Sequence, residues 1–192
     1  MKITFKNISL ITSLIIMSFI SYDQNLTFDK IDDLANSKAN ELLYNNNIDK
    51  VLIYSNGCVG CERISLNECE CNLGFKRTYL LWKESNTFKI LKIDCCQVYE
   101  SKNINLDDLW NSLNKSKNEI FQSKFKSEFI TVHYSFTDIK LISDNNALES
   151  NIKDYYFDES NRYYNANKNQ PIIEFQKLIA KKINKFENGK TE

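Results

Sequence analysis

The chain comprises 192 residues, of which 42% are hydrophobic and 26% are charged, a composition typical of a globular protein and not of a disordered one. Lys and Arg together number 25, and so do Asp and Glu, which gives a formal net charge of zero. A neutral chain lacks the long-range attraction that nucleic acids and anionic membrane surfaces exert on basic proteins, and we expect neither as a partner.

The N-terminal segment has the layout of a secretory signal peptide. Lys2 and Lys6 precede a stretch from residue 7 to residue 21 without ionisable side chains. This stretch falls short of the about 20 apolar residues of a membrane-spanning helix. We therefore expect a signal peptide over residues 1–21, with the cleavage position open, and no stable membrane insertion; a retained anchor is the alternative. Residues 22–192 would form a single domain, exported to the periplasm or to the outside of a bacterial cell.

Apolar periodicity predicts the elements in the first half of the chain. Residues 27–44 repeat apolar side chains at helical spacing and carry acidic residues in the first turn. The continuous apolar run 51–54 fits a buried strand. Residues 78–82 and 87–93 are two β-rich runs separated by four polar residues, a pattern that predicts a hairpin.

The second half of the chain predicts a helix, a strand, a long loop and a terminal helix. Asn105 has the character of an N-cap for a helix through Phe125, which a break near Lys115 could divide. Residues 130–143 alternate as in a strand, and residues 144–170 predict a loop with a short edge strand at 155–157. Pro171 suits the first position of a helix. This order, which contains no repeated βα unit, predicts an α+β fold: a mainly antiparallel sheet with amphipathic helices packed on it and a disulfide-stapled hairpin region.

All cysteines fall between residues 58 and 96. They are Cys58, Cys61, Cys69, Cys71, Cys95 and Cys96. An even number of cysteines in an exported chain is typical of a disulfide framework. Steric constraints exclude a bond within the last pair and a bond between Cys69 and Cys71, and the connectivity otherwise stays open. Both groups lie at the open end of the predicted hairpin, so we expect bridges from Cys95 and Cys96 back to two of the other four, each contributing about 3–4 kcal/mol.

A second interpretation of the cysteines is redox catalysis. The C-x-x-C sequence of Cys58 and Cys61 follows the predicted strand 51–54, and over residues 49–63 this arrangement resembles that of thioredoxin-like proteins, in which the pair opens a helix. The resemblance implies a periplasmic thiol-disulfide oxidoreductase with Cys58 as the attacking thiol and Cys61 as the resolving thiol. Beyond Arg63 the chain departs from that family, because a hairpin follows and the only proline, Pro171, precedes a predicted helix.

A third interpretation is a structural zinc site. Cys58, Cys61, Cys69 and Cys71 could supply four thiolates, because a C-x2-C pair is a common half-site. An oxidising compartment favours disulfides over thiolate metal sites, so our primary expectation includes neither a metal nor a cofactor.

Two weaker signals concern single residues and an aromatic segment. His133 is the only imidazole, and we expect it to face solvent or to hydrogen-bond on a strand, because a triad or a histidine metal site needs companions. The predicted loop carries four tyrosines that could stack on a sugar or contact a protein partner, although packing against the sheet edge is the favoured alternative. They are Tyr155, Tyr156, Tyr163 and Tyr164.

These patterns predict an exported, disulfide-stabilised binding or structural protein without a recognisable active site. A protein or a glycan is the expected kind of partner, and the ligand and the oligomeric state stay open. The thiol-disulfide oxidoreductase at Cys58 and Cys61 is the enzymatic alternative.

Overall fold

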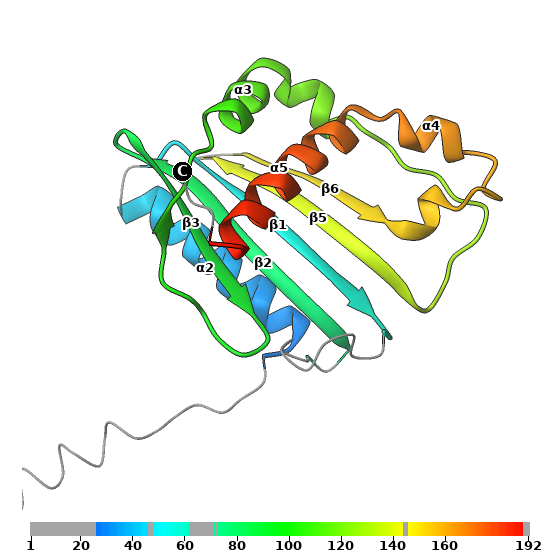
Figure 1. Ribbon diagram of the computed structural model, residues 1–192, viewed down its shortest axis with the longest axis horizontal. Helices are drawn as coiled ribbons and strands as arrows, with labels where there is room; N and C mark the ends of the chain where they lie inside the picture. The colour runs from blue at the N-terminus through cyan, green and yellow to red at the C-terminus, as the bar shows by residue number, and fades with distance from the viewer. Residues whose placement is uncertain (1–25, 46–47, 62–70, 72, 144–145, 190–192) are drawn as a thin grey trace, which may run out of the picture.

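In the described part of the chain, six strands form one central sheet (Figure 1). The computed structural model describes residues 26–45, 48–61, 71, 73–143 and 146–189. The strands lie in the order β4-β3-β2-β1-β5-β6, and each neighbouring pair runs antiparallel. Their bounds are β1 Lys50–Val59, β2 Gly74–Glu84, β3 Thr87–Asp94, β4 Lys102–Asn103, β5 Tyr134–Ser143 and β6 Asn146–Lys153. The helices are α2 Phe28–Asn45, α3 Asp107–Phe121, α4 Tyr164–Lys168 and α5 Pro171–Glu187, with a short 3-10 helix η2 Asp154–Phe157.

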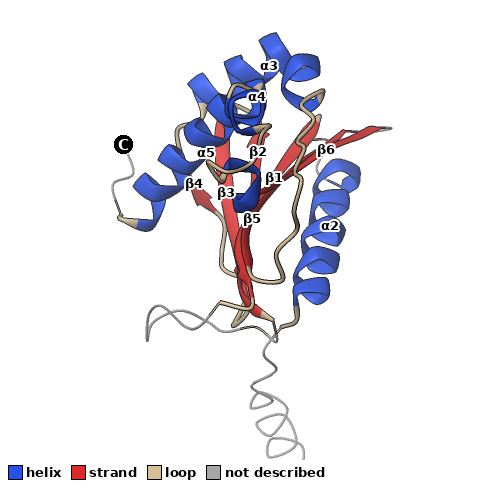
Figure 2. Ribbon diagram, turned by 90° about the vertical axis from the view of Figure 1, so that its right-hand side faces the viewer, coloured by secondary structure: helices blue, strands red, loops and turns tan. Residues whose placement is uncertain are grey.

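Helices cover both faces of the sheet. Figure 2 shows α2 on one side and α3 and α5 on the other. The two-residue period of a strand divides β1 between the two layers: Val51 and Ile53 pack in the core cluster that includes α2, and Leu52 and Tyr54 pack in the cluster that includes α3 and α5. A strand buried on both faces carries a continuous apolar run, which is why residues 51–54 predicted a buried strand.

The predicted fold class is confirmed, and so are most of the predicted elements. Helix α2, the β2–β3 hairpin and helix α5 lie where the apolar periodicity placed them, with strands longer than the apolar runs alone indicated. Pro171 occupies the first turn of α5, where its missing N–H leaves no intrahelical bond unmade. In the hairpin turn Ser85 adopts a positive φ of 54°, the left-handed conformation that a tight two-residue connection requires.

The prediction for residues 144–170 was wrong. Residues 146–153 form the edge strand β6, paired with β5 along its whole length. The sequence of β6 is too polar to predict a strand, because an edge strand with one open face carries few apolar side chains. The short strand predicted at residues 155–157 is instead part of the 3-10 helix η2.

Two further boundaries differ from the prediction. Strand β5 begins at Tyr134 and not at residue 130, and the side chains of Ile130 and Val132 are exposed, so the alternation there did not reflect burial. Helix α3 ends at Phe121 and its N-cap is Leu106, while the side chain of Asn105 accepts a hydrogen bond from the backbone N–H of Asp107 at 3.2 Å. The helix has a non-helical residue at Ser116, next to the predicted break.

None of the helices in the described part of the chain is both long enough and apolar enough to cross a membrane. The predicted signal peptide, residues 1–21, lies outside the described residues.

Candidate functional site

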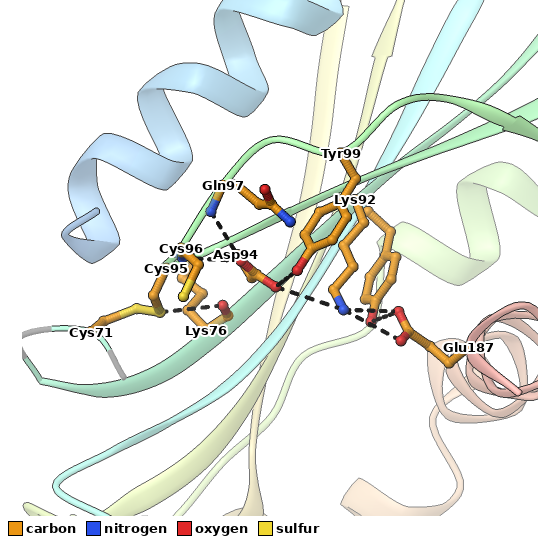
Figure 3. Close-up of polar contacts among 10 residues, drawn as sticks. Cys71, Lys76, Lys92, Asp94, Cys95, Cys96, Gln97, Tyr99 and Glu187 are labelled. Carbon is orange, nitrogen blue, oxygen red and sulfur yellow. Dashed lines mark hydrogen bonds and ion pairs between the residues drawn. A yellow bond between two sulfur atoms is a disulfide. The ribbon is translucent and has the colours of Figure 1, made fainter. Parts of the chain in front are cut away.

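A disulfide between Cys71 and Cys95 closes the open end of the β2–β3 hairpin (Figure 3). Their Cα atoms lie 5.2 Å apart and the two residues are 24 positions apart in the sequence. Both side chains are buried. This is a bridge of the kind predicted from Cys95 back across the hairpin. Cys96 is disulfide-bonded as well, and Cys69 lies outside the described residues.

A second disulfide joins Cys58 to Cys61 within the C-x-x-C sequence, with a Cα separation of 5.7 Å. The chain-entropy relation assigns about 2 kcal/mol to a closed loop of this length, against about 3.5 kcal/mol for the Cys71–Cys95 loop. The C-x-x-C bond thus contributes the smaller part of the cross-linking stability. Cys58 is 1% exposed, whereas Cys61 is partly exposed. Accessibility is therefore the reverse of what a role for Cys58 as the attacking thiol requires.

Backbone hydrogen bonds hold the C-x-x-C turn independently of its disulfide. The N–H of Gly60 donates to the carbonyl of Leu73 at 2.7 Å. The carbonyl of Gly60 lies 2.6 Å from Nδ1 of His133, and because a carbonyl only accepts, Nδ1 carries the proton. Gly60 has a φ of +70°, and a Cβ at this position would collide with the imidazole ring, so only glycine fits the turn.

A polar cluster connects the Cys95–Cys96 turn to the C-terminal helix α5 (Figure 3). One carboxylate oxygen of Asp94 accepts from the backbone N–H groups of Cys96 and Gln97 at 3.0 and 3.2 Å, and the other accepts from the hydroxyl of Tyr99 at 2.8 Å. Lys92 then links Asp94 to Glu187 of α5, at 3.7 and 3.2 Å. The cluster fixes the cysteine turn to the sheet and to α5.

On the opposite face of the sheet, a pocket of about 480 Å³ opens between α2 and the strands β5 and β6. This volume lies within the range of small-molecule sites. The pocket is lined by Asp32, Ala35, Asn36, Ile53, Ser55, Asp138, Ile139, Lys140, Glu149, Ser150 and Asn151. Antiparallel register brings them together, since Ser55 of β1 lies opposite Asp138 of β5, which lies opposite Asn151 of β6.

A buried lysine lies beside the pocket. The ammonium of Lys76 donates to both carboxylate oxygens of Asp32 at 2.6 Å, and its side chain is 4% exposed. The ring centroids of Phe28 and Phe136 lie 5.5 Å from the ammonium nitrogen, a distance at which an aromatic face attracts a cation. Asp32 and the two rings thus hold one positive charge in the interior.

Two carboxylates of the pocket remain after Lys76 has been paired with Asp32. Burial raises the pKa of the Asp138 carboxyl, and the nearby charge of Lys76 and a hydrogen bond from Asn151 lower it in part. Lys140 donates to the side chain of Asn36 at 2.9 Å. Glu149 is exposed, and its side chain makes no hydrogen bond or ion pair within the described residues. The pocket therefore presents two acidic groups, Asp138 and Glu149, beside the apolar side chains of Ala35 and Ile53.

Two of the four tyrosines of the predicted aromatic segment, Tyr155 and Tyr156, pack against each other and against neighbouring rings. The ring of Tyr155 is buried and contacts Tyr134 and Tyr156 edge to face, and the ring of Tyr156 stacks on Phe125 with centroids 5.3 Å apart. Tyr163 and Tyr164 are partly exposed. These contacts account for the first two tyrosines without a ligand.

Three of the four cysteines that the zinc interpretation needs form disulfide bonds. Cys58, Cys61 and Cys71 belong to disulfides, and zinc coordination requires deprotonated free thiols. In the described ranges, no group of three or more His, Cys, Asp or Glu residues is arranged to hold a metal ion.

Comparisons with protein-family models, with curated proteins and with solved structures find no match to this chain. The fold and the site therefore define only a broad structural class: an α+β protein with disulfides at one end of its sheet and a polar pocket on one face of the sheet.

Sequence patterns had identified the cysteines but not the pocket. The signals that could have indicated it are a lysine in strand β2, at Lys76, and an acid in strand β5, at Asp138. A charged residue in a strand that is buried on both faces needs a partner, and such a pair is a candidate site.

Proposed function

We propose that this chain is an exported, disulfide-stabilised binding protein and that the pocket between α2 and the β5–β6 strands holds a small organic cation. The observation that carries the proposal is the pairing of Lys76 with Asp32, because Asp138 and Glu149 are then the lining carboxylates that form no ion pair within the described residues. Disulfides support the exported location, because they persist in oxidising compartments.

The chemistry of the lining supports an alkylamine over an anion or a sugar. An ammonium group can donate hydrogen bonds to the two carboxylates, and its charge offsets theirs as water is displaced. The apolar side chains of Ala35 and Ile53, which lie in the core on the α2 side of the sheet, can contact the alkyl chain. A carboxylate ligand would face the like charges of Asp138 and Glu149, and the one lysine of the lining, Lys140, is already hydrogen-bonded to Asn36, which together disfavour such a ligand.

The test uses 1,4-diaminobutane as probe, with butylamine and succinate as comparisons, and measures binding by isothermal titration calorimetry and thermal shift. We expect the diamine to raise the melting temperature, succinate to have no effect, and Asp138→Asn and Glu149→Gln each to weaken binding at least about tenfold, or about 1.4 kcal/mol. Glu159→Gln removes an exposed carboxylate outside the pocket and serves as the matched control. Succinate binding more tightly than the diamine, or equal losses in the control, would contradict the proposal.

A further inference from the structure

The Cys58–Cys61 disulfide differs from the Cys71–Cys95 disulfide in its access to solvent. Cys71 and Cys95 are both buried, so no external thiol reaches either sulfur without local opening. In the C-x-x-C pair one sulfur belongs to a buried residue and the other to the partly exposed Cys61. Thiol-disulfide exchange requires a thiolate to approach one sulfur in line with the bond, so accessibility decides which disulfide reacts.

The surroundings of Cys61 suit a polypeptide thiol. Leu73, whose carbonyl accepts from Gly60, has a side chain that is 52% exposed. Val132, which precedes the His133 that contacts Gly60, is 80% exposed. Exposed apolar side chains on the two segments that bind the C-x-x-C turn favour contact with an unfolded chain, which itself exposes apolar residues.

The turn that carries the pair is also built to survive reduction. The hydrogen bonds of Gly60 to Leu73 and to His133 do not involve sulfur. Opening the disulfide would leave the two cysteines close together, because these bonds and the pairing of β1 with β2 and β5 persist. A pair held in this way can close again without rearrangement of the sheet.

We infer that the Cys58–Cys61 disulfide exchanges with dithiols of unfolded polypeptides, with Cys61 as the sulfur that is attacked. A substrate thiolate bonds to Sγ of Cys61 and the Cys58–Cys61 bond breaks, with its electron pair leaving on Sγ of Cys58. The second thiolate of the substrate then attacks the first sulfur of the substrate, and Cys61 leaves as a thiolate. The substrate loses two electrons and forms its own disulfide, and the protons of its two thiols pass to Cys58 and Cys61. The oxidised protein is itself the oxidant of this single turnover.

The test mixes the oxidised full chain, without oxygen, with an unstructured peptide that carries two cysteines between apolar residues. Free thiols are then identified by alkylation and mass spectrometry. We expect Cys58 and Cys61 to be alkylated together, one pair for each peptide disulfide formed, while Cys71 and Cys95 remain bonded. Equal reduction of both disulfides, or reduction of neither, would overturn the inference.

Two variants test which sulfur reacts. The oxidised peptide is offered to Cys58→Ser, which keeps Cys61, and to Cys61→Ser, which keeps the buried Cys58. We expect the first variant to accumulate a mixed disulfide with the peptide at least tenfold faster than the second. Faster trapping by Cys61→Ser would overturn the assignment. If either variant fails to fold, the alkylation experiment on the wild-type protein still tests the inference. The titration with 1,4-diaminobutane tests the pocket separately from these disulfide experiments.

Discussion

The ammonium of Lys76 lies 2.6 Å from both carboxylate oxygens of Asp32, so that strand β2 and helix α2 are joined by a bidentate ion pair next to the pocket. Lys76 is 4% exposed and Asp32 is 48% exposed. The lysine of this ion pair is thus buried, while its aspartate is partly exposed to solvent. Loss of the carboxylate should therefore destabilise the fold more than loss of the ammonium group.

Asp32→Asn should destabilise the fold by about 1–3 kcal/mol, because it leaves a buried ammonium without its counter-ion; the partial exposure of Asp32 keeps the loss below that of a fully buried pair. Lys76→Met should cost less than about 1 kcal/mol, since a methionine of similar shape can lie between Phe28 and Phe136. Urea unfolding of both variants measures the difference. If Lys76→Met lowers the free energy of unfolding as much as Asp32→Asn does, the unpaired buried charge is not the cause of the destabilisation in Asp32→Asn.

The two described disulfides should differ in their contribution to stability. Replacing Cys71 and Cys95 together by Ser should lower the free energy of unfolding by about 3–5 kcal/mol, because the closed loop is long and both sites are buried. The matched double replacement of Cys58 and Cys61 should lower it by about 2 kcal/mol. Guanidinium unfolding under non-reducing conditions compares the two, and the reverse order would show that the short loop is the main structural bond.

Asp138→Asn should stabilise the free protein at neutral pH and leave it unchanged at pH 3. Burial raises the pKa of the Asp138 carboxyl above its ordinary value. The wild type therefore loses stability as the pH rises from about 4 through that raised pKa, because the folded state holds the proton more tightly than the unfolded state. Thermal unfolding between pH 3 and pH 8 should show a gap in stability between wild type and variant that widens as the pH rises through the raised pKa of Asp138. A stability difference between wild type and Asp138→Asn that narrows as the pH rises would contradict this prediction.

Tyr79 should resist ionisation in alkaline solution. Burial and the neighbouring Glu187 carboxylate, which accepts from the tyrosine hydroxyl at 2.9 Å, raise the pKa of Tyr79 far above its ordinary value. The unfolded chain ionises this group near pH 10 and the folded chain does not, so stability should fall by about 1.4 kcal/mol per pH unit above pH 10 on account of this residue.

Tyr79→Phe removes that ionisation in both states, and its unfolding free energy should fall less steeply above pH 10 than that of the wild type. At pH 7 the variant should be less stable by about 1 kcal/mol, because the hydrogen bond to Glu187 is lost. Parallel curves above pH 10 would show that Tyr79 ionises in the folded protein.

Local periodicity predicted the elements with an apolar stripe and failed where burial did not follow the pattern. Helices α2 and α5 each bury one regular face and the β2–β3 hairpin buries both of its faces, so their residues carry the signal. Ile130 and Val132 alternate with polar residues as a strand would, yet both are exposed, because the chain there joins β5 only from Tyr134 onward. The alternation of apolar and polar residues shows that a segment could form a strand, but it does not show that a neighbouring strand is there to pair with it.

The disulfides and the pocket mark the limits of sequence reasoning about the site. Proximity at the open end of a hairpin sufficed to predict a bridge from Cys95, because the two strands bring their ends together. The pocket joins residues of α2, β1, β5 and β6, and the contact of Asp138 with Asn151 exists only through the β5–β6 register. Since β6 was predicted as loop, no pattern in the chain could place these side chains around one cavity.

Mapping of backbone amide shifts by NMR during a titration with 1,4-diaminobutane tests the central claim most directly. We predict saturable changes at residues 138–140 of β5, residues 149–151 of β6 and the facing residues of α2, and loss of these changes in Asp138→Asn. Changes at other parts of the surface, or changes at the pocket that persist in Asp138→Asn, would contradict the claim that this pocket binds a small organic cation.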